Sequence, residues 1–300
     1  MASTAFTPTT PFGRIVTAMV TPFASDGGLD LDGAAGLAEH LIDSGCDALV
    51  INGTTGECPT TTDEEKTAVL RAVLDAVGHR ARIIAGVGTH STAHSIEQAQ
   101  AAEAAGAHAL LAVTPYYSKP PQEGLFQHFT DIADATALPV MLYDIPSRTA
   151  TPIETETIVR LAAHERIIAV KDAKGDLGAT SWVLARTDLA YYSGDDMLNL
   201  SSLAIGSVGT VSVVSHLVAG ELRSMYDAYT GGDVAKAREI HQSLLPVFTG
   251  VFRTQGVITV KAALRRLGKP AGPVRLPLVD LTEEQLRTLR ADLAAAGITI

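Results

Sequence analysis

A lysine at the end of a very apolar stretch has the type and position that covalent chemistry requires. Lys171 follows the run Ile167–Val170. Burial there would disfavour the ammonium form and lower the pKa, as the amine of a Schiff-base lysine requires. The alternative is a rim lysine that extends to solvent beside Asp172. Lys174 falls in the loop that follows and is the weaker candidate for this chemistry.

The segment YDIPSR combines a phenol with a guanidinium. Tyr143 ends an apolar run, so its side chain is expected at the mouth formed by the strand ends. Arg148 follows shortly after and could hold a carboxylate with two parallel hydrogen bonds. Taken alone, the segment is equally well explained by an ion pair between Arg148 and Asp144.

Two further segments carry hydroxyl groups. In GTTGE, residues 53–57, two glycines allow tight turns, and the hydroxyls of Thr54 and Thr55 could bind a carboxylate. In TPYY, Tyr116 and Tyr117 could relay protons or form an aromatic wall. Taken singly, the first is more simply a turn before a helix, and the second a pair of packed tyrosines with wet hydroxyls.

These segments follow short apolar runs with few polar interruptions, as expected of strands buried on both faces of a parallel sheet. Eight strand–helix units in about 225 residues favour a (β/α)₈ TIM barrel over a doubly wound sheet. The stretch GVGTHS from Gly86 also lacks the third glycine of a dinucleotide-binding fingerprint. The eight runs are Ile15–Val20, Ala48–Asn52, Ile83–Val87, Ala109–Val113, Pro139–Tyr143, Ile167–Lys171, Ala190–Ser193 and Val208–Val213.

Helical patterns lie between these runs and fill the end of the chain. We therefore expect a catalytic barrel over residues 1–225 and a C-terminal helical extension over residues 226–300. Thr282 is a candidate N-cap of the last helix. The expected helices include Asp63–Val77, Ser91–Ala105, Ile153–Ala163, Val234–Val247, Val257–Leu267 and Leu281–Ala296.

Composition argues against several classes of protein. The formal net charge of -10 is unfavourable for binding to the phosphate backbone of a nucleic acid. The chain has two cysteines, Cys46 and Cys58, which are too few for a disulfide framework, and Cys46 is expected in the core. The histidines lack the spacing of metal ligands. Residues 1–13 lack the basic start and apolar stretch of a secretory signal, and no run is long enough to span a membrane. We expect a cytoplasmic protein.

GTTGE, TPYY, YDIPSR and AVKDA occur in this order, each at an expected strand end. Together with SGDD at Ser193–Asp196 and the helical end of the chain, they closely resemble the dihydrodipicolinate synthase family. That family belongs to the pyruvate-dependent aldolase superfamily, which includes N-acetylneuraminate lyase. The resemblance covers nearly the whole chain. It implies a barrel followed by three helices, usually assembled as a homotetramer of two tight dimers.

The resemblance assigns the covalent and proton-transfer roles residue by residue. Lys171 matches the lysine that forms an imine with the keto carbon of pyruvate. Tyr143 matches the tyrosine that shuttles protons, and Thr54 matches the threonine that links the two tyrosines of a relay. Tyr117 matches the second of these tyrosines, which in the family projects into the active site of the neighbouring subunit.

The resemblance also assigns substrate-binding positions. Thr55 matches a residue that binds the pyruvate carboxylate. Arg148 matches the arginine at the site entrance that binds the carboxylate of L-aspartate-4-semialdehyde. Gly194 and Val211 match backbone positions beside the bound keto acid, and Val211 replaces a more usual isoleucine.

The implied reaction is a lyase-class condensation of pyruvate with L-aspartate-4-semialdehyde on the diaminopimelate route to lysine. The lysine imine supplies the covalent catalysis, so neither an organic cofactor nor a metal is expected. Two alternatives remain, namely another 2-keto-acid lyase of the superfamily and a non-catalytic metabolite-binding relative. Thr54 and Thr55 together with Tyr117 and Arg148 favour the synthase over sugar-acid lyases, and the presence of Lys171 with its relay argues against the non-catalytic relative.

Some members of the family bind lysine as a feedback inhibitor at the tight-dimer interface, and this chain departs from that site. Tyr116 matches one contact, but His90 replaces a typical asparagine and His94 the glutamate that grips the lysine amine. Asp63 and Lys66 replace histidines. A cation at Lys66 and the missing glutamate predict weak or absent feedback by lysine.

Overall fold

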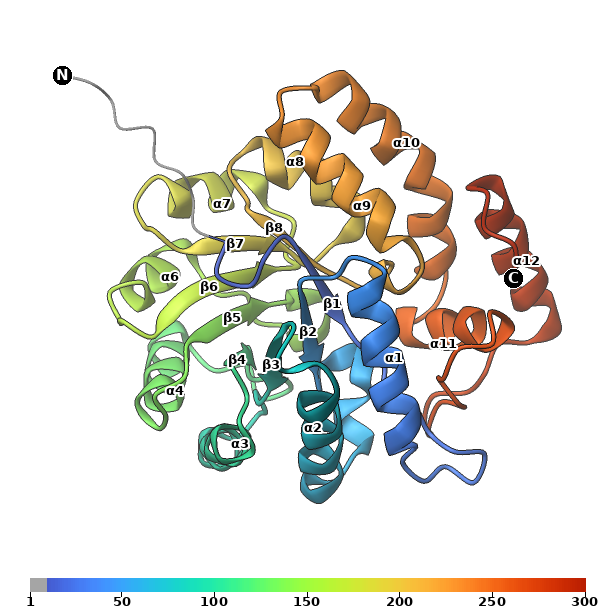
Figure 1. Cartoon of the computed structure of the whole chain (residues 1–300). Coiled ribbons are helices and arrows are strands. Elements are labelled where there is room, and N and C mark those ends of the chain that lie inside the picture. Colours follow the sequence, from blue (N-terminus) through green and yellow to red (C-terminus); the bar gives the residue numbers. More distant parts are fainter. Residues whose placement is uncertain (1–9) are drawn as a thin grey trace.

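A closed barrel of eight parallel strands forms the centre of the computed structural model, which describes residues 10–300 (Figure 1). Each strand pairs with the next, and the last pairs with the first. All eight predicted strands and the barrel are confirmed. The expectation that residues 1–13 are not a secretory signal falls largely outside the described residues. The strands are β1 (Ile15–Ala18), β2 (Ala48–Ile51), β3 (Arg82–Gly86), β4 (Ala109–Val113), β5 (Val140–Asp144), β6 (Ile167–Asp172), β7 (Ala190–Ser193) and β8 (Gly209–Ser212).

Both faces of the strands are buried, because successive side chains point alternately into the barrel and out towards the helices. In β1, Val16 and Ala18 belong to the cluster that fills the barrel, whereas Ile15 packs under the helices. The strand sequences are therefore almost continuously apolar, which explains why they were recognisable.

Helices surround the barrel, and several begin with caps that the sequence encodes. Thr62 caps α2 and Thr282 caps α12, each in a reciprocal capping box with the residue three positions later, so the predicted N-cap is confirmed. Cys46 is buried as expected. The helices of the barrel are α1 (Leu31–Asp43), α2 (Asp63–Val77), α3 (Thr92–Ala105), α4 (Gln122–Asp134), α5 (Pro146–Thr149), α6 (Thr155–Leu161), α7 (Leu177–Leu184), α8 (Asn199–Ala204) and α9 (Ser215–Thr230), with short 3₁₀ turns η1 (Thr54–Gly56), η2 (Cys58–Thr60) and η3 (Asp196–Leu198).

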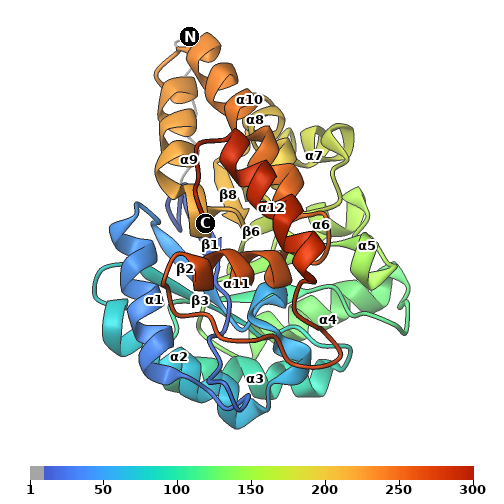
Figure 2. The ribbon, with the colours of Figure 1, turned by 90° about the vertical axis from the view of Figure 1, so that its right-hand side faces the viewer.

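The chain ends in three helices, as expected: α10 (Val234–Val251), α11 (Gly256–Arg266) and α12 (Glu283–Ala295). In Figure 2, α10 lies beside α9, and α11 and α12 lie on one side of the barrel. Helix α11 contacts η1, so the end of the chain reaches the carboxyl ends of the strands. The expected boundary at residues 225/226 falls within α9, and the division into two domains stays a prediction.

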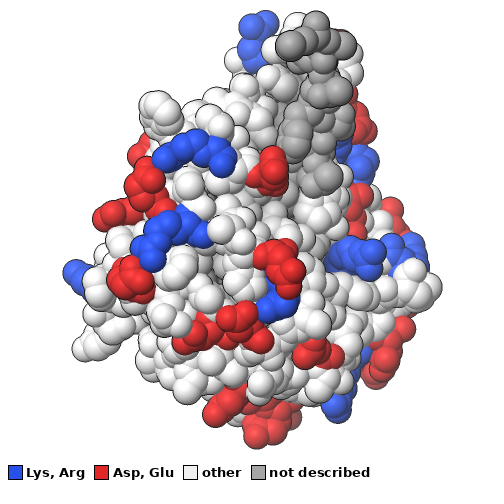
Figure 3. All heavy atoms as spheres, turned by 90° about the vertical axis from the view of Figure 1, so that its left-hand side faces the viewer, with Lys and Arg blue, Asp and Glu red and all other residues white. Residues whose placement is uncertain are grey.

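The surface in Figure 3 shows basic and acidic side chains interspersed, without a continuous basic area on that face. Such a surface gives a phosphate backbone no extended cationic track to follow, as the net charge also indicated. None of the helices within residues 10–300 combines the length and apolarity needed to cross a bilayer.

Candidate active site

Lys171 lies at the carboxyl end of β6, paired in register with Tyr143 of β5 and Tyr192 of β7. Only 4% of its surface is exposed, so it is not a lysine that extends to the rim. Its Nζ lies 4.1 Å from the centroid of the Tyr143 ring. Burial lowers the pKa of Lys171 to about 7, with the Asp196 charge opposing this shift and Arg148 adding to it. The amine is therefore available as a neutral nucleophile near neutral pH.

The phenol of Tyr143 lies within reach of the Thr54 side chain in η1, which favours the ionised form of the phenol. Burial raises the pKa of Tyr143 to about 12, although Arg148 and the Thr54 side chain oppose that shift. Tyr143 therefore keeps its proton at neutral pH and can pass it on through its hydroxyl. The structure brings these two predicted residues together beside Lys171.

Three of the predicted substrate-binding residues surround the same strand ends. Thr55 is buried in η1, and Val211 is buried inside the barrel in the same apolar cluster as Tyr143. A Cβ added to Gly194 would lie 3.1 Å from Cγ of Lys171 and 3.0 Å from Cβ of Ala173. Glycine at this position therefore keeps open the space beside the lysine.

Arg148 stands on α5 at the mouth of the barrel, on the walls of two adjoining cavities. One cavity, of about 310 Å³, is also lined by Thr54 and Thr55, and the other, of about 520 Å³, by Gly194. Arg148 donates from Nη2 to Oε1 of Gln255 at 2.6 Å. Its supposed ion pair with Asp144 is not formed, so that alternative is wrong. A neutral amide partner leaves the guanidinium charge unneutralised and suited to a substrate carboxylate.

Tyr117 does not join the other predicted residues within this chain. It has a positive φ of 73° and is 95% exposed. Such a φ is unusual for a bulky residue, and the side chain faces outward, so packing within the chain does not explain it. Tyr116, the other tyrosine of the pair, packs edge-on against His90, with ring centroids 5.4 Å apart.

Asp196, in the SGDD segment, was not predicted as a site residue, but its charge acts on Lys171. Its side chain is buried, and Oδ2 accepts hydrogen bonds from the backbone N–H groups of Val213 and Val214 at 3.1 and 3.2 Å. Burial raises the pKa of Asp196 despite these bonds. Its charge raises the pKa of Lys171, against the effect of burial. Asp196 thus helps to set how much of the lysine is neutral.

Sequence reasoning also missed a buried ion pair that holds the GTTGE loop. Glu57, in a left-handed conformation with φ 58°, places Oε1 2.5 Å from Nζ of Lys261 on α11. Its Oε2 accepts a hydrogen bond from the N–H of Arg275 at 2.9 Å. Both charged side chains are almost completely buried. The loop that carries Thr54 and Thr55 is therefore fastened to the C-terminal segment.

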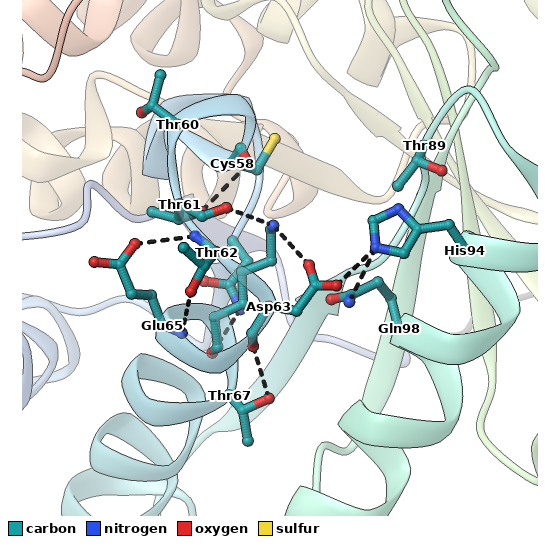
Figure 4. Close-up of polar contacts among 12 residues, drawn as sticks. Cys58, Thr60, Thr61, Thr62, Asp63, Glu65, Thr67, Thr89, His94 and Gln98 are labelled. Atoms are coloured by element: carbon teal, nitrogen blue, oxygen red, sulfur yellow. Dashed lines mark hydrogen bonds and ion pairs between the residues drawn. The ribbon is translucent and has the colours of Figure 1, made fainter.

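Three residues of the expected lysine site, Asp63, Lys66 and His94, form a polar cluster (Figure 4). Nζ of Lys66 donates to the carbonyl oxygen of Thr61 at 2.8 Å and lies 3.2 Å from Oδ1 of Asp63. The other carboxylate oxygen of Asp63 is 2.8 Å from Nε2 of His94. Burial raises the pKa of Asp63, but the bonds to His94 and Lys66 outweigh it and lower the pKa overall. Asp63 thus supplies a carboxylate beside His94, which replaces the glutamate of the family, and Lys66 already forms an ion pair with that carboxylate.

Within residues 10–300, no group of three or more His, Cys, Asp or Glu side chains could hold a metal ion. The polar groups around Lys171 are instead a phenol, hydroxyls, a carboxylate and a guanidinium. This set can transfer protons and bind carboxylates around a nucleophilic amine.

Comparison with known proteins gives a consistent result. The sequence model of the "Dihydrodipicolinate synthetase family" matches residues 11–296. "4-hydroxy-tetrahydrodipicolinate synthase 2" of Streptomyces coelicolor is 66% identical, over 98% of each chain. The crystal structure of dihydrodipicolinate synthase DapA-2 from Bacillus anthracis has a TM-score of 0.93 at 44% identity, covering 94% of this chain and 98% of that one. A lysine-bound structure from Cyanidioschyzon merolae has a TM-score of 0.94 at 42% identity, covering 95% and 98%.

Proposed function

This chain belongs to the dihydrodipicolinate synthetase family and acts as a 4-hydroxy-tetrahydrodipicolinate synthase, a lyase of lysine biosynthesis, and we propose that it works through a Schiff base between Lys171 and pyruvate. The observation that carries this proposal is the burial of Lys171 beside Tyr143, which keeps the lysine pKa at about 7. A lysine with its ordinary pKa would be almost entirely protonated at neutral pH and unable to attack a carbonyl carbon.

The first half-reaction activates pyruvate. The neutral Lys171 amine attacks the keto carbon, and loss of water from the resulting carbinolamine leaves an imine. Tyr143 supplies and recovers the protons for these steps, since its ring lies against the amine and its phenol keeps its proton at neutral pH. The Tyr143 phenolate, left when that group protonates the departing water, then takes a methyl proton, which converts the imine to an enamine, a carbon nucleophile.

The second half-reaction forms the carbon–carbon bond. The enamine carbon attacks the aldehyde of L-aspartate-4-semialdehyde, and the amine of that substrate then displaces Lys171, which closes the ring and frees the lysine. Arg148 binds the carboxylate of this substrate, and Thr55 binds that of pyruvate. The backbones of Gly194 and Val211 lie beside the keto acid. We expect no organic cofactor and no metal to take part.

We further propose that the working form is a homotetramer built from two tight dimers. The exposed side chain of Tyr117 supports this, because a tyrosine held outward with a positive φ can complete the relay of a neighbouring subunit. The relay then runs from Tyr143 through Thr54 to the neighbour's copy of this tyrosine. A cytoplasmic location fits a soluble biosynthetic enzyme and stays part of the proposal.

Trapping with pyruvate tests the proposal. Borohydride added after incubation with pyruvate should leave a reduced pyruvyl group on Lys171, located by mass spectrometry of the peptides. The yield should rise as the incubation pH passes through about 7, because only the neutral amine attacks. A sample without pyruvate is the control. An adduct on Lys174, or none at all, would refute the assignment.

Lysine should inhibit this enzyme weakly or not at all. Lys66 already places an ammonium group on the Asp63 carboxylate, so an incoming lysine amine meets a like charge there. We expect no half-inhibition below about 1 mM lysine, the affinity of a weak and non-specific contact. Initial rates measured at saturating pyruvate over a lysine series check this. Half-inhibition at sub-millimolar lysine would contradict it.

A further inference from the structure

A buried ion pair that the catalytic proposal does not use joins the strand ends at β5 and β6. Asp144 ends β5 with its side chain 1% exposed, and Lys174 lies in the loop after β6. Nζ of Lys174 is 3.3 Å from Oδ2 of Asp144, an ion pair rather than an aligned hydrogen bond. Burial raises the pKa of Asp144 to about 6 and Lys174 opposes this, so the carboxylate is charged at neutral pH.

Both side chains of this ion pair form hydrogen bonds with the backbone of Ile153. Oδ1 of Asp144 accepts a hydrogen bond from the N–H of Ile153 at 3.2 Å. Nζ of Lys174 donates to the carbonyl oxygen of the same residue, also at 3.2 Å. Ile153 is itself completely buried. Both backbone polar groups of Ile153 are therefore held by one ion pair, which we call the Asp144–Lys174 clamp.

The Asp144–Lys174 clamp joins the two ends of the segment that carries Arg148. This segment, residues 145–153, leaves β5 after Asp144 and returns to the carboxylate of that residue at Ile153. Lys174 is fixed in turn to β6, since its backbone N–H donates to Oδ1 of Asp172 at 2.8 Å. Hydrogen bonds within the segment preserve its local shape, but the clamp ties it to the strands that carry Tyr143 and Lys171.

We propose that the Asp144–Lys174 clamp is a positioning device that holds Arg148 over the barrel mouth for the carboxylate of the second substrate. The proposal rests on the function proposed above. Neither residue of the clamp touches a substrate, and both act through Arg148. The charge-assisted bond from a guanidinium to a carboxylate depends on geometry, so a small displacement of the segment weakens it.

Lys174→Met removes the cation and the donor to Ile153 while keeping the length of the side chain. We expect the KM for L-aspartate-4-semialdehyde to rise about tenfold, the effect of weakening one charge-assisted hydrogen bond. The KM for pyruvate and the yield of the pyruvyl adduct on Lys171 should stay unchanged. Lys236→Met, which breaks an exposed ion pair on α10, is the matched control and should alter neither KM.

The double variant Asp144→Asn/Lys174→Met separates positioning from stability. Lys174→Met alone leaves the Asp144 carboxylate buried without a cation and should lower the melting temperature. The double variant leaves no unpaired buried charge, so its melting temperature should recover towards the wild-type value, whereas the KM for the aldehyde should stay raised. If that KM recovers together with the melting temperature, or never rises in the single variant, the clamp has only a structural role and the inference is wrong. If the wild-type enzyme forms no pyruvyl adduct and condenses nothing, the proposed function fails, and with it the clamp.

Discussion

Lys171→Ala is expected to lower the rate of condensation by at least about 10³-fold, because it removes the covalent step itself rather than one contact to the transition state. The measurement is kcat with both substrates, supported by the loss of the borohydride-trapped pyruvyl adduct. The fold should remain intact. Lys171 lies near the end of its strand, and the Asp196 carboxylate keeps its hydrogen bonds from the backbone N–H groups of Val213 and Val214 when the lysine is removed.

The matched control for this variant is Lys236→Ala, a lysine on the exposed side of α10. It should retain the wild-type kcat and the adduct. Circular dichroism and thermal melting of both variants show whether folding is preserved. Turnover of Lys171→Ala near the wild-type rate would overturn the Schiff-base mechanism, and persistence of the adduct would place the imine on another lysine.

Lys261→Met is expected to destabilise the protein by about 3–5 kcal/mol, the usual cost of breaking a buried ion pair on one side. The variant leaves the carboxylate of Glu57 buried with only the N–H of Arg275 as a partner. The melting temperature should fall by about 10 °C, given the size of the chain. Because the same carboxylate fixes the turn that holds Thr54 and Thr55, pyruvate binding should weaken as well.

Two further variants show whether the buried, unpaired charge of Glu57 causes the destabilisation of Lys261→Met. Glu57→Gln/Lys261→Met removes both charges and should regain much of the lost stability, since a neutral pair carries no uncompensated charge. Lys236→Met breaks an exposed pair and should cost no more than about 0.5 kcal/mol. If Lys261→Met melts at the wild-type temperature, the pair contributes nothing to holding the turn.

The barrel could be predicted from the sequence because each of its units is local. Strands buried on both faces are continuous apolar runs, and α2 extends over Asp63–Val77 as predicted because the signals at its start lie next to one another. The interpretation of Lys171 was different. Its apolar neighbours allowed a partly buried amine, but a lone lysine in such a place more often extends to the rim. Only the segments at the other strand ends favoured the Schiff-base assignment.

The contacts that could not be predicted join residues far apart in the sequence. Arg148 and Gln255 are 107 positions apart, and no local pattern relates them. Lys174 was considered only as a competing nucleophile, because its partner Asp144 lies on another strand. The outward direction of Tyr117 was expected from the family resemblance alone, because it depends on a positive φ that its residue type disfavours. The contacts of Arg148 and Lys174 follow from tertiary packing that propensity and periodicity do not encode.

The link between Glu57 and Lys261 spans 204 positions and sets a limit on the order of events during synthesis. On the ribosome, the strands emerge one after another and can begin to pair, but the turn after β2 has no counter-charge until α11 has left the exit tunnel. A nascent chain that stops before residue 261 therefore lacks the ion pair that joins this turn to the C-terminal segment. We expect the turn that holds Thr54 and Thr55 to reach its final geometry only when almost all of the chain has been translated.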